Sequence, residues 1–128
     1  MKVICALLEQ HGRVLVTQRS ENMREPLLWE FPGGKLEAGE SEQECLVREL
    51  REELTLSVEP VLRLSPVVHH SPDRTIELIP YICMYHGGAI QLIEHRAYQW
   101  AKQDELPNYA WCPADLPIVQ EYLALKRG

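Results

Sequence analysis

The chain has 128 residues, of which 45% are hydrophobic and 25% are charged. This length and composition are typical of a single soluble globular domain, here residues 1–128, and are too small for two. The formal net charge is −6 and no basic patch stands out, which argues against a nucleic-acid polymer as partner.

Four cysteines lie far apart in the sequence, and no Cys-x-x-Cys pair occurs among Cys5, Cys45, Cys83 and Cys112. The apolar run at residues 3–8 is too short for a secretory signal or a membrane span. We therefore expect free thiols in a reducing compartment, a cytoplasmic location and no membrane partner.

The first elements predicted are two strands. Residues 2–8 and 13–18 are rich in β-forming side chains, and the His11-Gly12 pair between them predicts a hairpin turn. Arg19 closes the second run and Arg24 follows in a polar loop. By composition alone, both arginines are expected to be solvated.

Residues 27–32 form a short apolar run that predicts a third strand, ended by Pro32. Trp29 and Phe31 stand two positions apart, so they share one face of the strand and are expected in the core. Glu30 between them is expected either on a solvated face or in an ion pair.

A loop and a helix start come next. Residues 33–40 are punctuated by glycines, which allow a loop that brings backbone carbonyls and Glu37 or Glu40 to one place. Ser41 with Glu44 three residues later is the pattern of a capping box, which predicts that a helix begins here.

The predicted helix has one apolar face and one acidic face. Its apolar stripe consists of Leu46, Val47, Leu50 and Leu54. Glu49, Glu52 and Glu53 crowd a different face, where like charges repel one another. Such a cluster offers the hard oxygen ligands that suit Mg²⁺ or Mn²⁺. Taken singly, each glutamate would equally fit a solvated face balanced by Arg48 and Arg51.

Two longer β-rich runs, residues 56–68 and 75–85, flank a turn predicted at residues 71–74. His69 and His70 fall within this region, but neighbours on a strand point to opposite faces. We therefore do not expect them to bind one metal ion together.

The last part of the chain predicts a turn at Gly87-Gly88, a short β run at residues 90–93 and a helical turn at residues 105–107. A second helix is predicted over residues 114–126, with Asp115 as N-cap and the stripe Leu116, Val119 and Leu123. The mixture of strands and helices predicts the α+β class.

The stretch around the first helix resembles the signature of the Nudix hydrolase family. That signature is a glycine, five residues, a glutamate, seven residues, then Arg-Glu-apolar-any-Glu-Glu-any-Gly-apolar. The matching positions here are Gly34, Glu40, Arg48, Glu49, Leu50, Glu52, Glu53 and Leu56. Thr55 replaces the last glycine, and because Thr is unfavourable at positive φ, this departure concerns the local turn and leaves the ligand set intact.

The resemblance implies a mixed β-sheet between helices, an α/β/α sandwich. It also implies a Mg²⁺ or Mn²⁺ cofactor held by Glu49, Glu52, Glu53, a carbonyl of Gly33 or Gly34, and Glu94, which stands six positions before Trp100. Either Glu49 or Glu94 would take the proton from the attacking water. Arg48 would have a structural role, pairing with carboxylates of the signature such as Glu40.

The MutT branch of the family, which this chain resembles from end to end, cleaves nucleoside triphosphates to monophosphate and pyrophosphate. The resemblance implies that Arg19 contacts the phosphates, that Glu30, Phe31, Pro32 and Gly33 line the nucleotide pocket, and that Asp115 faces the base. Two substrate types stay open, an oxidised purine such as 8-oxo-dGTP and cytidine-type triphosphates. A catalytically silent nucleotide-sensing module is the alternative function, and both a monomer and a homodimer are compatible with the sequence.

Overall fold

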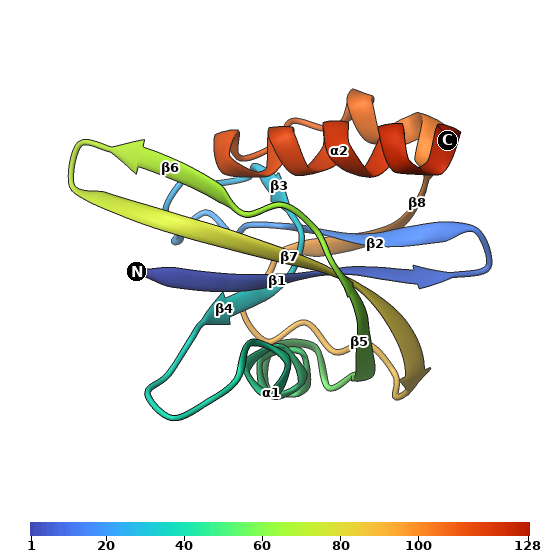
Figure 1. Ribbon diagram of the computed structural model, residues 1–128, viewed down its shortest axis with the longest axis horizontal. Coiled ribbons are helices and arrows are strands. Elements are labelled where there is room, and N and C mark those ends of the chain that lie inside the picture. Colours follow the sequence, from blue (N-terminus) through green and yellow to red (C-terminus); the bar gives the residue numbers. More distant parts are fainter.

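The computed structural model of the chain describes residues 1–128 and contains one eight-stranded sheet, two α-helices and two 3-10 helices. The elements in chain order are β1 (Lys2–Gln10), β2 (Arg13–Gln18), β3 (Trp29–Glu30), β4 (Gly33–Lys35), α1 (Glu42–Leu54), β5 (Ser57–Arg63), β6 (Val67–Ser71), β7 (Arg74–Gly87), β8 (Ala97–Lys102), η1 (Gln103–Asn108), η2 (Pro113–Asp115) and α2 (Leu116–Arg127). Helix α1 lies on one face of the sheet and α2 on the opposite face (Figure 1), so the predicted α+β sandwich is confirmed.

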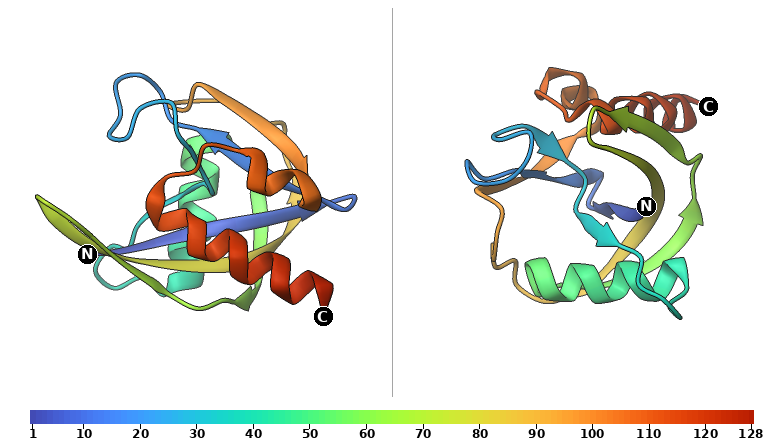
Figure 2. Two further views of the ribbon diagram at one scale, coloured as in Figure 1. Left: turned by 90° about the horizontal axis from the view of Figure 1, so that it is seen from above. Right: turned by 90° about the vertical axis from the view of Figure 1, so that its left-hand side faces the viewer.

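The sheet opens where β1 and β2 part. These strands form the predicted hairpin, but they pair only beside its turn, at Glu9↔Val14 and Gln10↔Arg13. Farther from the turn, β3 pairs with β2 and β4 pairs with β1, so the segment from β3 to β4 crosses between the two separating strands. On its other edge, β1 runs parallel to β7. The views in Figure 2 show this crossing segment between the two helical layers.

Alternate residues of β1 feed two separate cores, as the period of a strand requires. The core beneath α1 includes Ile4, Ala6 and Leu8 of β1 together with Leu46, Leu50 and Leu54 of the helix. The core beneath α2 includes Cys5 and Leu7 together with Phe31, Ile118 and Tyr122. Each fully buried leucine contributes about 1.5–3 kcal/mol. These two cores fix both helices on the central sheet.

Helix α1 buries nearly the stripe that was predicted. Leu46, Leu50 and Leu54 are buried, but Cys45 replaces Val47 as the fourth buried residue. Val47 packs at the edge of the core and is only partly buried. All four cysteines of the chain are free and buried.

The predicted strand over residues 27–32 is wrong in extent, because only Trp29 and Glu30 have strand pairing. Leu27 has a φ of 65°, in the left-handed region, which breaks the strand before it begins. Gly33 and Gly34 were predicted in a loop, but they belong to β4, which pairs with β1.

Three further predictions of elements need correction. The run over residues 56–68 is two strands, since pairing stops at Arg63 and resumes at Val67. The β run predicted at residues 90–93 does not form, and a strand not predicted, β8, follows it and pairs with β2. Helix α2 starts two residues later than predicted and buries Ile118, Val119 and Tyr122, whereas Leu116 is 46% exposed. Neither helix has the length and apolar character needed to cross a membrane.

Candidate active site

The ends of α1 are defined by the residues that the sequence singled out. The capping box is confirmed: the Ser41 hydroxyl accepts from the Glu44 amide at 3.0 Å, and the Glu44 carboxylate accepts from the Ser41 amide at 2.8 Å. At the other end, Thr55 is left-handed, with φ 58° and ψ 32°. Its amide donates to the carbonyl of Arg51, and its hydroxyl donates to the carbonyl of Ala89 at 2.6 Å. The helix therefore ends in a left-handed turn although threonine stands where the signature has glycine.

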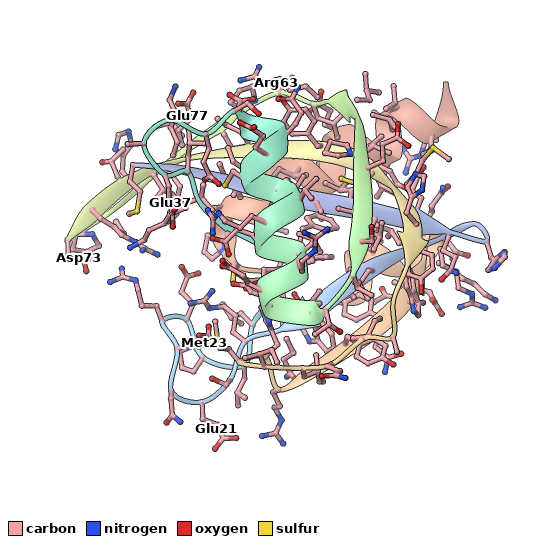
Figure 3. The ribbon with its side chains drawn as sticks, turned by 90° about the horizontal axis from the view of Figure 1, so that it is seen from below. Glu21, Met23, Glu37, Arg63, Asp73 and Glu77 are labelled. Carbon is pink, nitrogen blue, oxygen red and sulfur yellow. The ribbon has the colours of Figure 1, made fainter.

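Arg48 ties the loop before α1 to the acidic face of the helix. Its Nε and Nη2 donate to the two oxygens of Glu40 at 2.6 and 2.8 Å. Its Nη1 donates to Glu49 at 2.9 Å and to Glu52 at 3.1 Å. The hydrogen bonds from Arg48 and the Glu37 backbone lower the pKa of Glu40 to about 2. One planar guanidinium thus offsets the repulsion among three carboxylates. Figure 3 shows α1 lying across the sheet, with Glu37 in the loop that Arg48 holds.

The two glycines of β4 are required by close approach. A Cβ on Gly33 would lie 1.9 Å from the carbonyl oxygen of Ile4. A Cβ on Gly34 would lie 2.2 Å from the carboxyl carbon of Glu49. The Glu49 carboxylate therefore rests directly against the backbone of residue 34. Burial raises the pKa of Glu49, although Arg48 opposes the shift.

Glu53 is the most perturbed carboxylate on α1. Burial, followed by the charges of Glu49, Glu30 and Glu94, raises its pKa to about 8. Its Oε2 is buried and has no hydrogen-bond donor in the protein. A buried carboxylate oxygen without a donor is costly unless a cation or a proton meets it. This oxygen is therefore a candidate ligand for a hard divalent ion.

The remaining acidic residues do not converge on one point. Glu52 is held by Arg48. Glu94 is exposed on the segment before β8. This segment is attached to the end of α1, because the Ile93 amide donates to the carbonyl of Glu53 at 3.4 Å. In this conformation no three His, Cys, Asp or Glu side chains enclose a common position.

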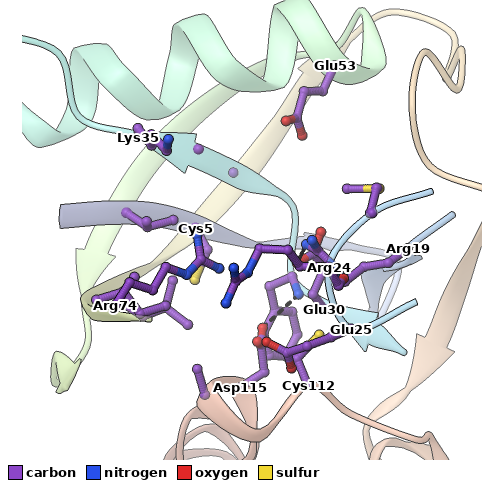
Figure 4. Close-up of a pocket in the computed structure, with 18 residues that line it drawn as sticks. Cys5, Arg19, Arg24, Glu25, Glu30, Lys35, Glu53, Arg74, Cys112 and Asp115 are labelled. Atoms are coloured by element: carbon purple, nitrogen blue, oxygen red, sulfur yellow. Dashed lines mark hydrogen bonds and ion pairs between the residues drawn. The ribbon is translucent and has the colours of Figure 1, made fainter. Parts of the chain in front are cut away.

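A pocket of about 190 Å³ lies between α1 and η2, at the opening of the sheet. Its lining includes seven of the residues expected at the site, namely Arg19, Glu30, Phe31, Gly33, Gly34, Glu53 and Asp115. Of the residues expected to bind metal or substrate, four lie outside the lining, namely Pro32, Glu49, Glu52 and Glu94. Figure 4 shows Glu53 projecting from α1 at one end of this pocket and Asp115 at the other.

Glu30 is paired, one of the two states that the sequence allowed. Its Oε1 accepts from Nη1 of Arg19 at 2.8 Å, and its Oε2 contacts Nε2 of His95 at 2.8 Å. Arg19 is thus not a freely solvated strand end but part of the pocket wall. His95 was not predicted; its side chain is only 1% exposed, and its Nδ1 has no partner. The only sequence signal for it was its place next to Glu94.

Arg24 is exposed, as predicted, and it is also held in an ion pair. It pairs with both carboxylate oxygens of Asp73 in the turn between β6 and β7, and it lines the pocket. This ion pair connects two segments that lie 49 positions apart in the sequence.

Asp115 does not cap α2, so that prediction is wrong. Its side chain makes no hydrogen bond to the helix amides, and the residue is 4% exposed. Its Oδ2 instead accepts from the amide of Phe31 at 3.0 Å, across the pocket wall. Burial, then the charge of Glu30, raises the pKa of Asp115 well above its ordinary value. A carboxyl group is therefore held at the end of the pocket away from α1, against the backbone of Phe31.

Solved structures with this architecture include proteins of similar sequence. The solution structure of the Escherichia coli ORF135 protein superposes with a TM-score of 0.88 and 34% identity, covering 98% of this chain and 89% of that one. The crystal structure of a MutT protein from Methanosarcina mazei Go1 gives a TM-score of 0.85 and 26% identity, covering 98% of this chain and 94% of that one.

Sequence comparison gives the same relationship. A CTP pyrophosphohydrolase of Escherichia coli (strain K12) is 34% identical over 126 residues, covering 98% of this chain and 93% of the relative. A protein named putative 8-oxo-dGTP diphosphatase 2, from Mycobacterium tuberculosis (strain ATCC 25618 / H37Rv), is 37% identical over 119 residues. The match covers 88% of this chain and 81% of the relative. Residues 1–122 match the NUDIX domain family. The chain therefore belongs to the Nudix hydrolase family.

Proposed function

We propose that this chain is a Mg²⁺-dependent nucleoside triphosphate pyrophosphohydrolase of MutT type. It converts a nucleoside triphosphate and water to the monophosphate and pyrophosphate, and it removes cytidine-type or oxidised nucleotides from the pool. One observation carries this proposal: a single pocket joins the Asp115 carboxyl and the Arg19 guanidinium to the buried carboxylate of Glu53. A nucleotide needs these three features in this order, for its base, its phosphates and its metal.

The metal-binding residues in this proposal are Glu53, Glu52, Glu49, a backbone carbonyl of Gly33 or Gly34, and Glu94. The Glu53 oxygen that lacks a donor is the observation that supports them. Mn²⁺ has the same preference for oxygen ligands. When bound, the ion neutralises polyphosphate charge and lowers the pKa of the attacking water.

The protein's own groups position the reaction. Arg19 donates one Nη to Glu30 and its Nε to the carbonyl of Arg24, which leaves Nη2 without a partner in the protein and available to a phosphate oxygen. Glu49 or Glu94 accepts the proton of the attacking water. Arg48 holds the β4–α1 loop against the helix, so the carbonyls of the glycines keep their place relative to the glutamates.

The base is proposed to lie against Asp115. Burial raises the pKa of Asp115, so its ionised form needs a hydrogen-bond donor from the ligand. That form only accepts hydrogen bonds, which suits an exocyclic amine such as cytosine N4. One oxygen of Asp115 is already used by the Phe31 amide, and the other is available to the ligand. The names of the relatives include both CTP and 8-oxo-dGTP, and the cytidine type is the one we favour.

The test is release of pyrophosphate from a panel of triphosphates, including CTP, dCTP, 5-methyl-dCTP and 8-oxo-dGTP, with Mg²⁺ and then with a chelator. We expect metal-dependent release of one pyrophosphate per monophosphate formed, fastest for the cytidine type. Tight binding of a triphosphate without any release would instead assign a nucleotide-sensing role.

A further inference from the structure

The loop between β2 and β3 carries a carboxylate that no part of the proposed chemistry uses. Glu25 lines the pocket, and its Oε2 is buried without any hydrogen-bond donor in the protein. Figure 4 shows its side chain beside Asp115 and Cys112, at the end of the pocket away from Glu53. The charge of Glu25 contributes to raising the pKa of both of these neighbours, after burial and the charge of Glu30.

Two charged residues near Glu25 that also line the pocket are already paired. Glu30 has Arg19 and His95. Arg24, the nearest cation in sequence, is taken by Asp73. Among these carboxylates, Glu25 alone has a buried oxygen that no protein group satisfies. A buried polar group without a partner in a native protein calls for an explanation, and a ligand donor is one.

The backbone of the loop is also strained at this position. Glu25 has a φ of 48° and Leu27 a φ of 65°, both in the left-handed region that non-glycine residues avoid. Such strain persists only where the surroundings impose it, and it is concentrated at ligand sites.

Several contacts impose this conformation. The Arg19 amide donates to the carbonyl of Leu28, and the Leu27 amide donates to the carbonyl of Arg19. The Gln18 side chain donates to the carbonyl of Leu27 at 3.1 Å. The Arg24–Asp73 ion pair ties the loop to the β6–β7 turn; in Figure 3 Met23 marks the loop and Asp73 marks the turn. The loop is thus anchored on both sides of Glu25, which keeps the carboxylate directed into the pocket.

We propose that Glu25 is a second specificity-determining residue, which accepts a hydrogen bond from the exocyclic amine of the nucleobase beside Asp115. This inference rests on the proposed function. A carboxylate can accept from N4 of cytosine or from N2 of a guanine-type base, and it has nothing to accept from a base that lacks the amine. An exocyclic amine carries two N–H groups, so Glu25 accepts from one and Asp115 from the other.

The chain offers a matched pair of variants for the test. Glu25→Gly removes the carboxylate and places glycine where the backbone is left-handed, so the variant should fold at least as stably as the wild type. Leu27→Gly makes the same backbone change two residues away in the same loop, at a side chain that is 42% exposed and does not line the pocket. Any effect of loop flexibility alone appears in both variants.

The substrates should differ by one amine. CTP is compared with the triphosphate of the 4-deamino analogue, pyrimidin-2-one riboside, and 8-oxo-dGTP with 8-oxo-dITP. We expect Glu25→Gly to lower kcat/KM for the amine-bearing member of the preferred pair roughly tenfold or more, the effect of losing one hydrogen bond to a charged group. The amine-free member should be unaffected, and so should both substrates in Leu27→Gly.

An equal loss in the two glycine variants, or an equal loss for a base with and without its amine, would overturn the role of Glu25 while leaving the proposed function standing. A wild-type protein that releases no pyrophosphate from any triphosphate would overturn both. The substrate pair in which Glu25→Gly lowers the ratio of kcat/KM with the amine to kcat/KM without it identifies the amine that Glu25 binds, N4 of cytosine or N2 of the purine.

Discussion

At the scale of single residues, Glu53 combines burial, a raised pKa and an unsatisfied oxygen. Its pKa is about 8 in the folded chain, against an ordinary 4.5, so the folded protein binds this proton more tightly than the unfolded chain does. The stability that this group contributes is therefore complete below about pH 4.5 and is lost as the pH rises to about 8. A divalent metal ion would take the place of the proton and restore the lost stability.

From this we predict that Glu53→Gln, without metal, is more stable than the wild type at pH 8 by roughly 1–4 kcal/mol, and that the difference vanishes toward pH 4.5. The same variant should lose nearly all turnover with Mg²⁺. Urea unfolding at several pH values, with a chelator present, measures the first effect. Near wild-type turnover at saturating Mg²⁺ would show that Glu53 does not bind the ion.

Asp115 gives the second prediction at this scale. Asp115→Asn keeps an acceptor for the Phe31 amide and adds a donor, so the fold should persist while the hydrogen-bonding pattern offered to the base changes. We expect the ratio of kcat/KM for CTP to that for 8-oxo-dGTP to fall roughly tenfold or more. If both activities dropped by the same factor, Asp115 would be a structural link between η2 and β3 and not a reader of the base.

At the scale of elements, the end of α1 shows how the protein accommodates a departure from its family's pattern. A left-handed β-branched residue costs about 1–2 kcal/mol, and the Thr55 hydroxyl regains about 0.5–1.5 kcal/mol through its bond to Ala89. That bond also ties the helix end to the segment that carries Glu94. The two contributions nearly cancel, which explains why threonine is tolerated.

The prediction at this scale uses two substitutions of Thr55. Thr55→Gly loses both the strain and the bond, so its free energy of unfolding should stay within about 1 kcal/mol of the wild type. Thr55→Val keeps the strain and loses the bond, so it should be the less stable variant, by about 1 kcal/mol or more. Equal stability of the two in urea unfolding would mean that the left-handed strain at residue 55 is negligible.

At the scale of the whole molecule, a few long-range pairs hold the pocket together. His95 joins the segment before β8 to Glu30 of β3, and its side chain is 1% exposed. His86 and Glu59 make a contact of similar length, 2.7 Å, but the His86 side chain is 48% exposed. The two pairs are therefore the same His–Glu contact, one with a buried histidine and one with an exposed histidine, and can be compared directly.

We predict that His95→Ala lowers the free energy of unfolding by about 2–4 kcal/mol, because it leaves a cavity and removes a partner from Glu30. His86→Ala should change it by less than about 1 kcal/mol. If His95 positions Glu30 and Arg19, His95→Ala should also lower kcat/KM, and its effect should not add to that of Arg19→Ala. Thermal unfolding and a double-mutant cycle measure these effects, and strict additivity would remove the positioning role.

The sequence by itself determined the elements whose signals are local. Three features depend only on residues that are close in the sequence: the capping box at Ser41, the apolar stripe of α1 and the β1–β2 hairpin. All three formed as predicted, apart from Cys45 replacing Val47. Helical periodicity also brought Glu52, four residues after Arg48, within reach of its guanidinium. Glu40 reaches Arg48 from the loop before the helix, so that contact needed the fold of the loop as well.

Only the tertiary structure decided the pocket. Its walls come from β1, β3, β4, α1, β7, η2 and the β2–β3 loop. These elements meet because β1 and β2 separate and because β1 pairs with a strand more than 70 residues away. Asp115 faces Phe31 instead of capping α2, His95 is buried against Glu30, and the Glu25 carboxylate is directed inward by a strained loop. None of these contacts follows from local spacing, because each depends on where long-range pairing places the backbone of another element.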